Sequence, residues 1–184
     1  MTNGPTFPWH LTNLGNWTHL TNVDQSSAAS GPFDVKQPDS GIATAALPGS
    51  STSVGRFIRA VFYSNFTEKV ADPDKAMHNL SRIMNNFDRP RALSTSPATG
   101  GGEGMKSQGI DSGNAGPPTE YTVWTNMADL SRGQFFFRSY DAFSWTSFDL
   151  SAIEEANEPR AMLTSQLDAL GGDGTKALLA GMGI

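Results

Sequence analysis

The chain has 184 residues, of which 38% are apolar and 17% charged, and its net charge is −5. This length allows one domain with a hydrophobic core, and the mildly acidic balance argues against a nucleic-acid partner, which would need clustered Lys and Arg. The absence of cysteine excludes disulfides, thiolate metal ligands and a cysteine nucleophile within these residues. No apolar stretch reaches the roughly 18 residues of a membrane span, so we expect no membrane partner. The segment from Met1 to Pro5 lacks the basic and apolar regions of a signal peptide, which leaves the localisation unknown.

The first third of the chain combines one short helix with a long irregular segment. Pro5 and Pro8 predict a turn, because each proline biases the residue before it toward extended backbone. A helix is expected over residues 9–20, with Leu11 and Leu14 on one side. Residues 22–53 are rich in Ser, Pro, Gly, Ala and Asp, which predicts a loop that is long for a compact domain.

Two amphipathic helices are predicted next. The first covers residues 52–65 with Ser53 as its N-cap, and its apolar residues recur at helical spacing: Val54, Phe57, Ile58, Val61 and Phe62. The second begins with Asp72 as cap and Pro73 at the first helical position, and it stops before Pro90.

The second half of the chain changes to a strand pattern. Residues 93–119 form a Gly- and Ser-rich loop, and three aromatic and β-branched runs follow at 120–127, 134–140 and 145–150. These runs predict an antiparallel meander. A helix over 151–169 must start, break or kink at Pro159, and 171–184 is expected to be a weakly ordered tail. The element order predicts the α+β class, with helices packed on an antiparallel sheet.

Two motifs suggest ligand binding but fail in detail. The word HLTN occurs twice and places His10 and His19 nine residues apart. On one helix this is about two and a half turns, so the two imidazoles would face opposite sides. The stretch TGGGEGMKS at 99–107 lacks the Gly directly before Lys that a phosphate loop needs. We therefore predict no cofactor and no metal.

Local patterns give modest roles to two further residues. Arg56 lies in the first turn of the helix predicted at 52–65, where a cation opposes the helix dipole, and a solvated arginine is the simplest interpretation. Asn3 precedes a Gly-Pro pair, which is typical of an Asx turn. Neither residue alone indicates catalysis.

Four sequence blocks nevertheless resemble one enzyme family. They are TNGPTFPWHLTNL at 2–14, ALPGSSTSVGRFIRAVF at 46–62, NNFDRP at 85–90 and TEYTVWTNMADLSRGQFFFRSYD at 119–141. In this order they resemble the choloylglycine hydrolase family, which includes bile salt hydrolases and penicillin V acylases and belongs to the N-terminal nucleophile hydrolases. The resemblance implies part of an αββα fold, in which two antiparallel sheets pack between helix layers.

The resemblance also implies a chemistry and two site residues. In this family an N-terminal cysteine attacks an amide carbonyl, its own α-amine acts as base, and water releases the acid from the acyl-enzyme. Asn3 matches the asparagine whose side-chain amide helps to form the oxyanion hole. Arg56 matches the arginine beside the nucleophile, which would favour thiolate over thiol, and Arg59 is a weaker candidate.

The departures from the family pattern are as informative as the matches. The family cysteine is absent, Pro8 stands where the family usually has Asp, and Ser50 stands where it has Asp after Pro-Gly. We therefore interpret residues 1–170 as the C-terminal part of a linear-amide hydrolase domain, with loops at 22–53 and 93–119 and the tail at 171–184. Whether the chain acts as an enzyme by itself is left open by the family, and we expect it to be inactive alone because it lacks the nucleophile.

Two other interpretations remain open. The chain could be a non-enzymatic ligand-binding or interaction module derived from the same fold, or a subunit that pairs with a separately encoded N-terminal half. The expected partner is a small-molecule N-acyl amide, with penicillin V, conjugated bile salts and N-acyl homoserine lactones all in scope. Homo-oligomerisation of the parent protein and a periplasmic or cytoplasmic location in a bacterium are further implications of the resemblance.

Overall fold

The fold is described from a computed structural model, which covers residues 4–95, 119–156 and 159–183. The chain divides into two compact units, residues 1–69 and 70–184, and each is treated by itself. In the described residues no helix combines the length and apolar character needed to cross a membrane.

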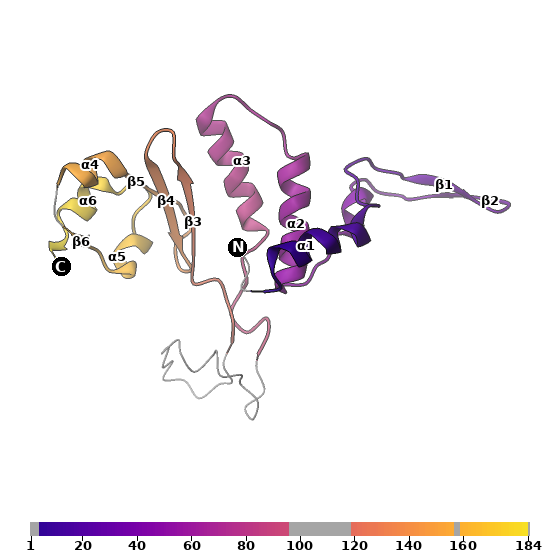
Figure 1. Ribbon diagram of the computed structural model, residues 1–184, viewed down its shortest axis with the longest axis horizontal. Helices are drawn as coiled ribbons and strands as arrows, with labels where there is room; N and C mark the ends of the chain where they lie inside the picture. Colours follow the sequence, from indigo (N-terminus) through magenta and orange to yellow (C-terminus); the bar gives the residue numbers. More distant parts are fainter. Residues whose placement is uncertain (1–3, 96–118, 157–158, 184) are drawn as a thin grey trace. The chain divides into compact units, whose positions relative to one another are not determined.

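The first unit joins two helices and a hairpin. Helix α1 (Phe7–Asn13) runs into the 3-10 helix η1 (Leu14–Trp17), which together replace the single helix predicted at 9–20. Strands β1 (Ser27–Ser30) and β2 (Phe33–Lys36) pair antiparallel, followed by the short 3-10 helix η2 (Ile42–Ala46). The hairpin lies inside the segment where the composition predicted only loop, and Figure 1 shows its two strands running side by side.

Helix α2 (Ser53–Phe66) is the main helix of the first unit and confirms the helix predicted at 52–65. Its N-cap is Thr52 rather than Ser53, because the Thr52 side chain accepts a hydrogen bond from the Gly55 amide. The buried stripe also differs from the predicted one. Ile58 and Phe62 are buried as expected, whereas Val61 is exposed, and Gly55 and Arg59 complete the buried face.

The second unit opens with α3 (Pro73–Asn85), whose start is as predicted. Asp72 caps the helix by accepting from the Lys75 amide at 3.0 Å, and proline occupies the first helical position. Strands β3 (Trp124–Asp129), β4 (Gln134–Ser139) and β5 (Thr146–Asp149) form the predicted antiparallel meander, and α3 lies against β3. The expectation of helices packed on an antiparallel sheet is confirmed within this unit.

The C-terminal part of the second unit is built from short elements. The helix predicted over 151–169 is interrupted around Pro159: α4 (Leu150–Glu155) precedes it, and β6 (Arg160–Ala161) and α5 (Thr164–Asp168) follow. Strand β7 (Gly172–Asp173) pairs parallel with β5, α6 (Thr175–Leu179) comes next, and β8 (Met182–Gly183) pairs with β6. The segment expected to be a weak tail thus carries secondary structure, and the domain boundary near residue 170 stays a prediction.

A tripartite contact fastens the β3–β4 turn to the start of α3. Arg132 donates from Nε to Asp129 Oδ2 at 2.6 Å and from Nη1 to Asp74 Oδ1 at 2.7 Å. Asp129 also accepts from the Ser131 hydroxyl at 2.6 Å. The hydrogen bond from Ser131, followed by the one from Arg132, lowers the pKa of Asp129 from 3.8 to about 2, because both stabilise the ionised carboxylate.

Candidate functional site

Arg56 lies near the N-terminus of α2, where the backbone is firmly held. Its amide donates to the Thr52 carbonyl at 2.9 Å, which is the first hydrogen bond of the helix, and the Gly55 amide donates to the Thr52 hydroxyl at 3.2 Å. The Arg56 side chain is half-buried. A cation at this end of a helix is opposed by the dipole, so helix electrostatics do not favour an arginine here.

Arg59, the weaker candidate from the sequence, has a different environment. Its side chain is buried, and Nη1 donates to the carbonyl oxygens of Pro48 at 2.6 Å and Ser50 at 2.7 Å. Its guanidinium is therefore committed to the backbone of the loop that leads into α2. Of the two arginines, Arg59 is therefore the one that holds the backbone of this loop.

The other predicted site residue, Asn3, lies outside the described residues, so its position relative to Arg56 stays a prediction. The helix that follows it is described. His10 on α1 is buried and stacks on Phe57 of α2, with ring centroids 4.4 Å apart and an interplanar angle of 21°. This contact brings together the first two sequence blocks that carry the family resemblance. His10 is thus a packing residue of the α1–α2 contact.

Metal binding finds no support in the part of the chain that the structure describes. No group of three or more His, Asp or Glu side chains there is arranged to hold an ion. The glycine-rich stretch at 99–107 lies outside the described residues.

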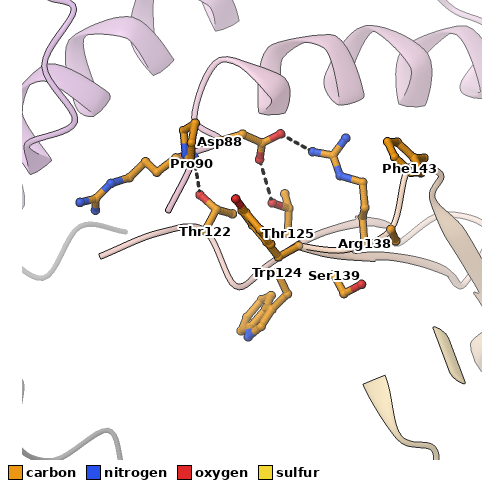
Figure 2. A pocket seen from close by; sticks show the side chains of 11 residues that line it. Asp88, Pro90, Thr122, Trp124, Thr125, Arg138, Ser139 and Phe143 are labelled. Carbon is orange, nitrogen blue, oxygen red and sulfur yellow. Dashed lines mark hydrogen bonds and ion pairs between the residues drawn. The ribbon is translucent and has the colours of Figure 1, made fainter. Parts of the chain in front are cut away.

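A pocket of about 390 Å³ opens in the second unit (Figure 2), between the segment after α3 and strands β3 and β4. It is lined by Asp88, Arg89, Pro90, Thr122, Trp124, Thr125, Arg138, Ser139, Tyr140, Ala142 and Phe143. All of these except Ala142 and Phe143 come from the third and fourth sequence blocks, in which no site residue is predicted from the sequence. The pocket depends on contacts across 30 or more residues, and no local sequence signal reports those.

An ion pair forms the polar centre of the pocket. Arg138 on β4 donates from Nη2 to Asp88 Oδ2 at 2.5 Å and from Nη1 to Asn85 Oδ1 at 2.9 Å. Its guanidinium also lies over the ring of Trp145, 4.7 Å from the centroid. Figure 2 shows the Asp88 carboxylate between Arg138 and Thr125, whose hydroxyl lies 3.5 Å from Asp88 Oδ1. Because Asp88 and Arg138 pair with each other, this contact at the centre of the pocket holds the end of α3 against the sheet.

The segment after the ion pair is fastened by aromatic and backbone contacts. Arg91 lies over the rings of Tyr121 and Tyr140, 4.5 and 4.7 Å from their centroids, and its amide donates to the Tyr140 hydroxyl at 3.2 Å. Arg89 pairs with Glu120 at 2.7 Å. These contacts account for the block NNFDRP as a structural element.

The family follows from comparison with known proteins. Residues 1–99 match the family model described as linear amide C–N hydrolases, choloylglycine hydrolase family. The chain belongs to the choloylglycine hydrolase family of this class, as the four sequence blocks predicted.

Curated relatives are similar over most of this chain. The bile salt hydrolase/transferase of Lactiplantibacillus plantarum is 24% identical over 151 residues, which cover 82% of this chain and 41% of the relative. The conjugated bile acid hydrolase of Lactobacillus acidophilus is 30% identical over 150 residues, covering 82% of this chain and 42% of the relative. The chain thus spans about two fifths of the length of these relatives.

Solved structures confirm the fold. A mutant of the conjugated bile acid hydrolase of Clostridium perfringens superposes with a TM-score of 0.61 at 20% identity, covering 82% of this chain and 40% of that one. The penicillin V acylase of Agrobacterium tumefaciens gives 0.53 at 24% identity, covering 82% and 35%. The predicted N-terminal nucleophile hydrolase fold is therefore shown for the part that this chain covers.

Proposed function

We propose that the 184 residues are the C-terminal part of an enzyme that hydrolyses linear amide C–N bonds of N-acyl compounds. The family match over residues 1–99 supports the reaction class. The observation that carries the proposal is Arg56, a half-buried cation at the N-terminus of α2 whose neighbour Arg59 takes the structural role. Because these residues contain no cysteine, the nucleophile comes from outside them and the chain is inactive alone.

Arg56 acts on the nucleophile electrostatically. A guanidinium stays protonated at any working pH, so it favours a neighbouring thiolate without competing for its proton. Each unit by which it lowers the thiol pKa raises the thiolate fraction about tenfold as long as the thiol pKa lies above the working pH. The cost of placing a cation against the helix dipole, about 0.3–1 kcal/mol, is consistent with a residue kept for chemistry.

Asn3 acts on the oxyanion. In the proposed reaction the thiol proton passes to the cysteine α-amine, and the sulfur attacks the amide carbon. The C–N bond then breaks as the amine takes up the proton, and water hydrolyses the thioester. The side-chain NH₂ of Asn3 donates to the negative oxygen of the tetrahedral intermediate. Loss of one such donor costs about 2.7–4 kcal/mol of transition-state stabilisation.

The substrate is an N-acyl amide with an apolar acyl group. Relatives are named as hydrolases of conjugated bile acids and as a penicillin V acylase, and both substrate classes share this chemistry. N-acyl homoserine lactones carry the same linear amide. Side chains around the acyl group decide among these three substrate classes, and which of the three is used stays open.

An amine-release assay tests the proposal. The purified 184-residue chain is incubated with penicillin V and, separately, with a glycine-conjugated bile salt, and free amine is measured. No release above the buffer rate is expected. Turnover by the chain alone would contradict the external nucleophile.

The coding DNA upstream of these residues distinguishes two possible sources of the cysteine-bearing part. An in-frame cysteine-bearing segment supports one polypeptide, and a separate upstream gene supports two subunits.

Oligomerisation of the parent protein is proposed through the β1–β2 hairpin. All eight residues of the two strands are exposed, including Phe33 at 68% and Val35 at 48%. Exposed apolar side chains on a two-stranded ribbon favour burial against a second copy. Light scattering after gel filtration tests this: F33D with V35D should shift the assembled enzyme to a smaller species, and an unchanged mass would exclude the hairpin.

A further inference from the structure

Arg59 and the loop before α2 form a compact network. The buried guanidinium donates to two carbonyl oxygens, those of Pro48 and Ser50, from the same nitrogen. Hydrogen bonds to a charged donor are the stronger kind in proteins. Arg59 therefore holds the loop backbone against the first turn of α2 at two points.

Gly55 makes this close approach possible. A Cβ at position 55 would lie 2.4 Å from Ser50 Oγ and 2.7 Å from the Ser50 carbonyl oxygen, so any side chain would push the loop away. The Ser50 and Thr52 hydroxyls lie 2.9 Å apart, and Thr52 is the N-cap of the helix. The loop, the cap and the first helical turn are thus one interlocked unit.

Arg56 takes its backbone position from this unit. Its amide is bound to the Thr52 carbonyl at 2.9 Å, and Thr52 is itself held through Ser50. A displacement of residues 48–50 would move the cap and with it the residue from which the Arg56 side chain projects. Small displacements of a charge beside a nucleophile have large effects on rate.

We infer that Arg59 is a positioning residue that fixes Arg56 by clamping the loop 48–50 onto α2. This inference rests on the proposed function of Arg56. Arg59 acts through the backbone and not on substrate, because it is buried and donates to the loop carbonyls. The clamp also explains Gly55 and Arg59 in the second sequence block.

Hydrogen exchange on the full chain tests the clamp. Arg59→Met should speed exchange of the Gly55 and Arg56 amides by about tenfold or more, while peptides from residues 60–66 of the same helix keep their rates. Arg59→Lys, which keeps a cationic donor, should restore part of the protection. Unchanged rates at positions 55 and 56 would overturn the inference.

A second variant covers the case in which Arg59→Met unfolds the chain. Gly55→Ala retains Arg59 but drives the loop away from the helix, and it should speed exchange at the same amides. If Gly55→Ala leaves them protected, the clamp is overturned.

A spectroscopic measurement separates positioning from general stabilisation. Because the chain has no cysteine, a single nitroxide label can be attached through Arg56→Cys, or through Val61→Cys on the exposed face of the same helix as the control. Adding Arg59→Met should raise the mobility of the label at position 56 and leave that at 61 unchanged. Equal changes at both positions would reduce Arg59 to a general structural role.

Neither hydrogen exchange nor label mobility involves turnover. Failure of these tests would therefore leave the hydrolase proposal standing, and a failed hydrolase assay would leave the clamp standing.

Discussion

Replacing Arg138 with methionine should destabilise the second unit, because this side chain joins three elements. It pairs with Asp88 after α3, donates to Asn85 Oδ1 at the end of the helix, and covers the ring of Trp145 before β5. Methionine keeps much of the apolar stem but removes every donor. Asp88 and Asn85 then lose the cation that both contact.

The expected magnitude follows from the three contacts. The Arg138 side chain is only 15% exposed, but Asp88 is 40% exposed, so solvent screening holds the ion pair to about 1 kcal/mol. The hydrogen bond to Asn85 contributes about 1 kcal/mol, and the cation over the Trp145 ring adds roughly 0.5–1 kcal/mol. The free energy of unfolding should therefore fall by about 2–3 kcal/mol.

Urea titration followed by tryptophan fluorescence measures this loss, since Trp145 itself senses the change. The matched control is Arg82→Met, which removes an exposed arginine from the last turn of α3 and should cost less than about 0.5 kcal/mol. If Arg138→Met costs no more than this control, the ion pair contributes nothing and the structural role assigned to the pocket centre is wrong.

Three further predictions concern other parts of the chain. Because the pKa of Asp129 is lowered to about 2, the stabilising effect of its carboxylate is complete above pH 4 and is lost as the pH falls toward 2. The urea midpoint of the native chain should fall over this range, and that of Asp129→Asn should fall less. Ala92 has a φ of 63°, so Ala92→Gly should raise the free energy of unfolding by about 0.5–1 kcal/mol, measured by thermal melting. His10→Ala should lower the stability of the first unit by about 2–4 kcal/mol, because His10 is 1% exposed and stacked on Phe57, and an unchanged denaturation curve would contradict that packing.

Elements with strong local signals were predictable from the sequence. The start of α3 follows from an aspartate cap and a proline at the first helical position, both of which act within one turn. The three strands of the meander follow from aromatic and β-branched runs separated by turn residues. In each case the interactions that decide the structure lie within a few residues.

The β1–β2 hairpin carried no comparable signal. Its strands are exposed on both faces, so they need no alternation of apolar and polar residues, and four of their eight residues are Ser or Ala. The turn is set by Gly31, whose φ of 60° suits a two-residue hairpin loop. Composition alone therefore predicted a loop.

The candidate site also combines features that local sequence predicts with features that only the folded chain reveals. The position of Arg56 in the first turn of a helix follows from sequence periodicity, and the family resemblance supplies its proposed role. The structural role of Arg59 could not be predicted. Helical spacing places Arg59 beside Arg56, but only the folded loop brings the Pro48 and Ser50 carbonyls to its guanidinium. The pocket around Arg138 likewise depends on residues about 50 positions apart.

The most direct test measures the nucleophile in the assembled enzyme, with the 184 residues joined to the segment that supplies the cysteine. The rate of thiol alkylation by iodoacetamide is followed against pH together with penicillin V hydrolysis, for the native sequence, Arg56→Gln and Arg56→Lys. We predict that Arg56→Gln raises the thiol pKa by about one unit or more and lowers hydrolysis at least in proportion, whereas Arg56→Lys retains part of both. An Arg56→Gln enzyme with an unchanged alkylation profile and full hydrolysis would contradict the role of Arg56 and the function built on it.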